Sequence, residues 1–152
     1  MQTIIGLGQA GCNIADCFKQ YPQYNILKID TNLKKSKGSI GLKPQATPEL
    51  YEEANLPRGL NKFLEEVKSE TLFITSCGAV SNVTLRLLEK IKDKTKITLM
   101  YIVPQRENMI GPQKLQNNLL FNVFQEYARS AVFEKIILVD NELISGIMGP
   151  VP

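Results

Sequence analysis

The first 32 residues carry the strongest constraint on the fold, a glycine-rich turn between an apolar strand and a helix. Thr3-Ile4-Ile5 predicts a short buried strand, and Gly6, Gly8 and Gly11 follow it with the spacing Gly-x-Gly-x-x-Gly. Glycine permits a tight turn and a close approach of backbone N–H groups to a ligand, and the next helix directs the positive end of its dipole there. The segment therefore predicts a site for nucleotide phosphates.

Apolar strands alternate with segments of helical spacing along the chain, which is the pattern of a parallel sheet with helices on both faces. We predict strands near residues 2–6, 25–30, 71–75, 97–103 and 135–139. Helices are predicted at Asn13 to Lys19, Leu60 to Val67, Val83 to Ile91 and Leu115 to Arg129. The expected fold is thus an α/β, three-layer, Rossmann-like parallel sheet.

The stretch from Lys34 to Arg58 has no firm periodicity and is predicted to be a long loop with one helical turn near Glu49 to Ala54. The last predicted helix presents an apolar stripe that we expect to lie in the core, formed by Leu115, Leu119, Leu120, Val123, Phe124 and Tyr127.

The composition indicates one globular domain over residues 1–152, because 152 residues with 43% hydrophobic side chains suffice for one core. A net charge of +3 with acids and bases interspersed gives no nucleic-acid-binding signature. No apolar run approaches the ~20 residues that span a bilayer, and the chain begins without a signal-peptide pattern. We therefore expect a cytoplasmic protein with no membrane insertion.

The three cysteines, Cys12, Cys17 and Cys77, are odd in number and lack CxxC spacing, and the chain contains no histidine. These features argue against a disulfide framework and against a zinc site, so reduced thiols are expected. The absence of histidine also excludes Ser-His-Asp and Cys-His nucleophilic machinery. We predict no catalytic residue from the sequence.

In open parallel sheets, ligands bind outside the carboxyl ends of the strands. The segments that follow the predicted strands are Gly8 to Asn13, Asp30 to Asn32, Thr75 to Asn82, Pro104 to Gly111 and Asp140 to Glu142. This convergence locates a pocket without naming its ligand. The spacing Gly6-x-Gly8-x-x-Gly11 with an acid at Asp30 also meets the dinucleotide fingerprint, in which the acid bonds the ribose of NAD.

Gly8-Gln9-Ala10-Gly11-Cys12-Asn13 resembles the first nucleotide loop of the tubulin and FtsZ superfamily, and Asp30-Thr31-Asn32 resembles its second loop. The resemblance covers nearly the whole chain. It implies a guanine-nucleotide-binding domain that binds GTP or GDP, with Mg²⁺ as a companion ion, and that acts in nucleotide-dependent self-assembly. The predicted contacts in these loops are Gly8, Gln9, Ala10, Gly11, Cys12, Asn13 and Asp30.

The later motifs of that family match less closely. Ser76 to Asn82 stands where the family has its glycine-threonine phosphate loop but holds one glycine, so a diphosphate fits more easily than a triphosphate; its predicted contacts are Cys77, Gly78 and Ser81. Aligning on Gly111 places Lys114 where the family has a ribose-binding arginine. Asn141 stands where an asparagine faces guanine, and an amide offers both a donor and an acceptor to a base. A cap on the following turn is an equal alternative for Asn141.

The chain has no counterpart of the family's long central helix, its acidic catalytic loop or its second domain. It is therefore either a reduced relative or a piece of a longer chain. At most a GTPase of the tubulin and FtsZ type is implied, without efficient hydrolysis by this chain alone. Acids such as Asp16, Glu107 and Glu142 could hold magnesium, but no pairing singles them out.

Three functional hypotheses remain open. The first is a tubulin/FtsZ-like guanine-nucleotide-binding module that forms a homo-oligomer or filament. The second is the NAD-binding Rossmann domain of an oxidoreductase. The third is an interaction protein that keeps the fold and has lost nucleotide binding.

Overall fold

The computed structural model describes residues 2–34, 36–103 and 111–140, and its centre is a six-stranded sheet. The strands are β1 (Gln2–Leu7), β2 (Tyr24–Asp30), β3 (Ser39–Gly41), β4 (Ser69–Ser76), β5 (Thr95–Val103) and β6 (Phe133–Asp140). Their order across the sheet is β3-β2-β1-β4-β5-β6, and every neighbouring pair is parallel. This is the order of doubly wound nucleotide-binding folds, and it confirms the predicted α/β class.

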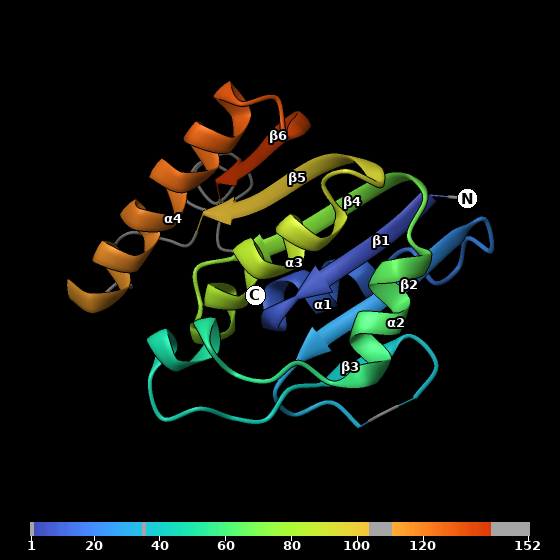
Figure 1. The fold of residues 1–152 in the computed structure, drawn as a ribbon, viewed down its shortest axis with the longest axis horizontal. Helices are drawn as coiled ribbons and strands as arrows, with labels where there is room; N and C mark the ends of the chain where they lie inside the picture. The colour runs from blue at the N-terminus through green and yellow to red at the C-terminus, as the bar shows by residue number, and fades with distance from the viewer. Residues whose placement is uncertain (1, 35, 104–110, 141–152) are drawn as a thin grey trace, which may run out of the picture.

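Helices cover both faces of the sheet (Figure 1). On one face lies α1 (Gly8–Asp16), which packs Ala15 against Ile4, Leu72 and Ile74. On the other face α2 (Arg58–Glu66), α3 (Thr84–Ile91) and α4 (Gly111–Arg129) contribute to a larger core. Two 3₁₀ helices, η1 (Pro48–Glu52) and η2 (Ala79–Val83), lie in the connections. The three-layer arrangement is therefore as predicted.

The five predicted strands are all present, and β3 is an additional strand inside the predicted long loop. Three residues are too short to give a recognisable hydrophobic alternation. Main-chain bonds hold this edge strand to β2: the Lys28 N–H donates to the Gly38 carbonyl at 2.8 Å, and the Leu42 N–H donates to the Asp30 carbonyl at 2.9 Å. Gly38 has a φ of +82°, which favours glycine at this turn. The predicted helical turn in the same loop corresponds to η1.

Two helices begin earlier than the sequence pattern predicts. Helix α1 begins at Gly8, directly after β1, and not at Asn13, and α4 begins at Gly111 and not at Leu115. Both early turns contain glycine or proline, whose low helix propensity hides the helix from a pattern search. The glycine-rich segment is therefore itself the first turn of α1.

The apolar stripe of α4 is only partly in the core. Leu120 and Phe124 are 6% and 2% exposed, as predicted, but Leu115 and Leu119 are 61% and 57% exposed. The prediction was wrong for these two leucines, because the first half of α4 extends past the part of the sheet that its second half covers (Figure 1).

The described helices were also compared with the length and hydropathy that a membrane span requires. None of them is both long and apolar enough to cross a bilayer.

Candidate nucleotide-binding site

A groove of about 420 Å³ lies at the carboxyl ends of β1, β2 and β4. The chain order reverses across the sheet at β1 and β4, and doubly wound folds bind their ligands at this switch point. We call this groove the switch-point pocket; its lining residues are Leu7, Gly8, Gln9, Ala10, Asp30, Asn32, Ser76, Cys77, Gly78, Ala79, Val80 and Ser81. The structure thus brings the segments after three predicted strands together.

The first wall of the pocket is the amino terminus of α1. Its N-cap is Leu7, and within the part of the chain that the structure describes no side-chain capping bond forms at this helix end. Gly8 has a φ of +76°, and a Cβ atom built there would meet nothing within 4 Å, so the backbone at Gly8 is open to the pocket. Uncapped N–H groups and the positive end of the helix dipole together favour an anion at this point.

Gly6 and Gly11 have a different task from Gly8, because they bring α1 close to the sheet. A Cβ atom on Gly6 would lie 2.4 Å from the Gly11 carbonyl oxygen. A Cβ atom on Gly11 would lie 2.4 Å from the Ile74 carbonyl oxygen. Both residues are buried, and Gly11 does not line the pocket. Of the three motif glycines, Gly8 is therefore the one that faces the candidate ligand.

Cys12 and Asn13, two further predicted contacts, lie outside the lining of the pocket. Cys12 is 7% exposed, and its thiol donates to the carbonyl oxygens of Gly6 and Ile29, each at 3.5 Å. Burial raises the pKa of the Cys12 thiol to about 11, so the thiol is protonated and unreactive at neutral pH. Asn13 is exposed on α1. The described geometry gives Cys12 a role in packing.

The second wall follows β2. Asp30 ends this strand, and its Oδ1 accepts the Thr31 N–H at 2.7 Å. Asn32 lines the pocket two residues further on. Among the described lining residues, Asp30 is the one with a charged side chain. A carboxylate here can accept hydrogen bonds from sugar hydroxyls or bind a hydrated cation.

The third wall is the loop that joins β4 to η2. The Gly78 N–H donates to the Ser81 hydroxyl oxygen at 3.1 Å, and the Ser81 hydroxyl donates to the Ser76 carbonyl. The side chain of Val80 is buried in the larger core. The loop therefore closes on itself, and its polar groups form a compact turn with a single glycine.

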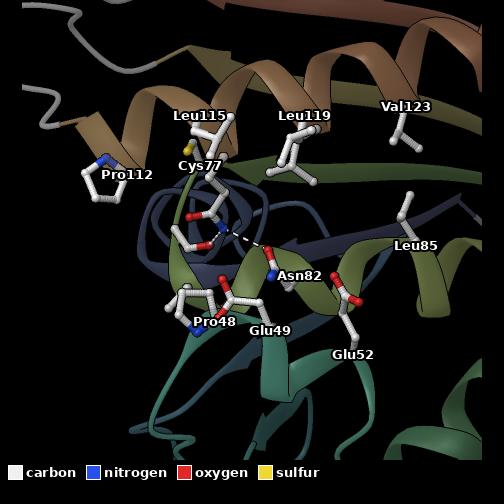
Figure 2. A pocket seen from close by; sticks show the side chains of 14 residues that line it. Pro48, Glu49, Glu52, Cys77, Asn82, Leu85, Pro112, Leu115, Leu119 and Val123 are labelled. Atoms are coloured by element: carbon white, nitrogen blue, oxygen red, sulfur yellow. Dashed lines mark hydrogen bonds between the residues drawn. The ribbon is translucent and has the colours of Figure 1, made fainter.

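Helix α4 holds this loop in place. The Gln116 Nε2 group donates to the Gly78 carbonyl oxygen at 2.7 Å and to Asn82 Oδ1 at 2.8 Å. The dashed line that reaches Asn82 in Figure 2 marks the second bond. No sequence motif marks Gln116, because its role depends on two contacts across more than thirty residues. Sequence reasoning therefore missed this residue.

Cys77 lies in the same loop and is half-buried. Burial raises the pKa of its thiol, and an interaction with the Tyr101 hydroxyl lowers it to a smaller extent. The Tyr101 hydroxyl also donates to Asn117 Oδ1, and burial raises the pKa of this phenol. Both groups are neutral at pH 7 and form part of a polar contact between the β4–η2 loop, β5 and α4.

The remaining predicted residues lie either outside the lining of the pocket or outside the described residues. Lys114 is exposed on the first turn of α4 and is not among the lining residues. Asn141 lies outside the described residues, as do Glu107, Glu142 and nearly all of the segment after β5. Within residues 2–34, 36–103 and 111–140, no group of three histidine, cysteine or carboxylate side chains is arranged to hold a metal ion.

Comparison with protein-family models finds no match, and comparison with curated proteins finds no significant relative. The tubulin/FtsZ resemblance therefore rests on the short motifs quoted above. Fold and pocket define the chain as an α/β protein with a parallel, doubly wound sheet and an open groove at its switch point.

Proposed function

We propose that this chain is a guanine-nucleotide-binding domain of the tubulin and FtsZ type, which binds GDP or GTP in the switch-point pocket. The observation that carries the proposal is the uncapped amino terminus of α1, where Gly8 leaves the backbone open to the groove. The volume of about 420 Å³ falls in the range of small-molecule sites. Helix N–H groups of this kind bind phosphates in many nucleotide-binding folds.

The loop after β4 lines the same groove as Gly8, so phosphates bound at α1 would lie beside the compact turn around Gly78. Because the Gly78 N–H and the Ser81 hydroxyl bond within the loop, a diphosphate fits this proposal better than a triphosphate. The choice of guanine comes from the sequence resemblance, in which Asn141 reads the base. The same resemblance carries the proposal of Mg²⁺, of nucleotide-dependent self-assembly into a homo-oligomer or filament in the cytoplasm, and of GTPase activity at most in the assembled state.

A second candidate is an NAD-binding domain, and Asp30 favours it. This carboxylate ends β2 and lines the pocket, where dinucleotide-binding folds place the acid that bonds the adenosine ribose. Two variants distinguish the candidates. Asp30→Ala should weaken the binding of NAD strongly and the binding of GDP less. Asn141→Ala should weaken the binding of GDP and have little effect on the binding of NAD.

A charge placed at the first turn of α1 tests the phosphate site. Gln9 is exposed and lines the pocket, and Gln9→Glu changes its charge with almost no change of shape. A carboxylate at a helix amino terminus leaves the helix as stable or slightly more stable. It should nevertheless repel a diphosphate and weaken the binding of GDP at least about tenfold. The measurement is the rise in Tm that saturating GDP produces.

The matched control is Gln23→Glu, at the amino end of β2 and thus at the opposite edge of the sheet. It adds the same charge to an exposed glutamine and should leave the GDP-induced rise in Tm unchanged. Equal responses of the two variants would place the nucleotide somewhere other than α1. A wild-type Tm that no nucleotide shifts would favour the third hypothesis, a fold without a ligand.

A further inference from the structure

A second groove of about 500 Å³ adjoins the switch-point pocket, between α4 and η1. We call it the α4 groove. Figure 2 shows Leu115, Leu119 and Val123 along its α4 side, and Glu49 and Glu52 on the opposite side. The groove thus has an apolar wall and an acidic rim that face each other.

The apolar wall is an unusual surface for a helix that also contributes to the core. Leu115 and Leu119 are one turn apart and are 61% and 57% exposed. Leu85 of α3 and the buried Leu120 continue the apolar surface into the groove. Single exposed leucines are ordinary, but a contiguous apolar strip in a groove with a polar rim is typical of a protein-binding surface.

The acidic rim carries charge that the described part of the chain does not neutralise. Glu49 and Glu52 are exposed and three residues apart in a 3₁₀ helix, so their side chains project from the same side. Neither forms an ion pair within the described ranges. Arg86 holds η1 in place by donating to the carbonyl oxygens of Tyr51 and Ala54, at 3.0 and 2.6 Å.

We propose that the α4 groove binds a cationic amphipathic helix of a partner protein. The apolar face of that helix packs against Leu115, Leu119 and Val123, and Lys or Arg side chains on its flank meet Glu49 and Glu52. Apolar anchors spaced i, i+3 or i+4, and i+7 are the usual means by which a helix fills a groove. Leu115 to Val123 spans about 12 Å along α4, which matches two to three turns of a bound helix. The opposed charges fix its orientation.

The test uses a fluorescein-labelled synthetic peptide of about four helical turns, with leucines on one face and lysines on its flank. Fluorescence anisotropy with the full chain should show saturable binding. Leu119→Ser should weaken it about tenfold. Glu49→Gln combined with Glu52→Gln should weaken it about threefold at low salt and flatten its salt dependence.

Two matched controls lie outside the groove. Leu138→Ser removes a leucine that is 50% exposed on β6, and Glu53→Gln removes the exposed carboxylate next to Glu52. Both should bind the lysine peptide as the wild type does, and circular dichroism melting should show that every variant folds.

Several results would overturn the proposal. The first is that the lysine peptide does not bind. The second is that a peptide with glutamate in place of lysine binds equally well. The third is that the groove variants and their controls lose equal amounts of binding affinity. Sedimentation gives one more: if the wild type self-associates and Leu119→Ser abolishes that association, the occupant of the groove is a second copy of this chain.

Discussion

Gly11 illustrates how one residue of a binding motif can serve the fold. Any side chain there would contact the Ile74 carbonyl oxygen, so α1 would have to move away from β4. We expect Gly11→Ala to lower the free energy of unfolding by about 1–3 kcal/mol, the usual cost of overpacking. Urea denaturation measures this loss.

Gly78→Ala is the matched control for this prediction. Gly78 has an extended backbone with a φ of −137°, and the nearest atom to an added Cβ is Ser81 Oγ at 4.0 Å. Its substitution should change the free energy of unfolding by less than about 0.5 kcal/mol. Similar losses in both variants would contradict the packing role given to Gly11.

Cys12 should make stability depend on pH at alkaline values. Burial raises the pKa of this thiol from 9.0 to about 11, so its stabilising contribution is complete below pH 9. The contribution is lost between pH 9 and 11, because the unfolded chain ionises first. Over this range the free energy of unfolding falls by at most about 1.4 kcal/mol per pH unit.

Cys12→Ser isolates the effect, because serine can donate to the same carbonyl oxygens and does not ionise in this range. Other groups with a raised pKa, such as Tyr127 with a pKa of about 12, titrate alike in the wild type and in Cys12→Ser. Urea denaturation from pH 8 to 11 should therefore show a smaller loss of stability in the variant. Parallel curves would show that Cys12 is not responsible.

At the scale of elements, α4 contacts the β4–η2 loop, which forms one wall of the pocket. Gln116→Leu removes both hydrogen bonds from α4 to this loop. We expect faster hydrogen exchange at the η2 amides and a loss of about 1 kcal/mol in the free energy of unfolding. Exchange within β4 should accelerate by no more than the roughly fivefold that this global loss accounts for, whereas the η2 amides should accelerate more.

Gln125→Leu is the control, since Gln125 is exposed on the same helix and away from the loop. Hydrogen exchange measured by mass spectrometry should show that the η2 amides of this variant exchange as slowly as those of the wild type. If Gln116→Leu behaves in the same way, α4 does not restrain the loop.

The elements differed in how well the sequence predicted them. The long strands were predictable because central parallel strands are buried on both faces and form continuous apolar runs, as in Ile4 and Ile5. The edge strand β3 was not, because main-chain bonds and Gly38 specify it. The exposure of Leu115 and Leu119 was not predictable either, because an apolar stripe on a helix does not indicate how much of the helix the sheet covers.

At the scale of the whole molecule, the topology predicted where a pocket would lie but not which residues would line it. The carboxyl ends of β1, β2 and β4 meet in the switch-point pocket, as any doubly wound sheet requires. Gly8, Gln9, Ala10, Asp30, Cys77, Gly78 and Ser81 line it, while Gly11, Cys12 and Asn13 are not among its lining residues. The motif spacing could not separate these roles, because close packing and phosphate binding both select glycine.

The identity of the nucleotide is the central claim, and a calorimetric titration of the full chain tests it most directly. GDP, GTP, ATP and NADH would each be added with Mg²⁺ at the same concentrations. We predict saturable heats for GDP and GTP, and none at these concentrations for ATP or NADH. Binding of NADH without GDP, or silence from all four nucleotides, would contradict the proposed guanine-nucleotide site.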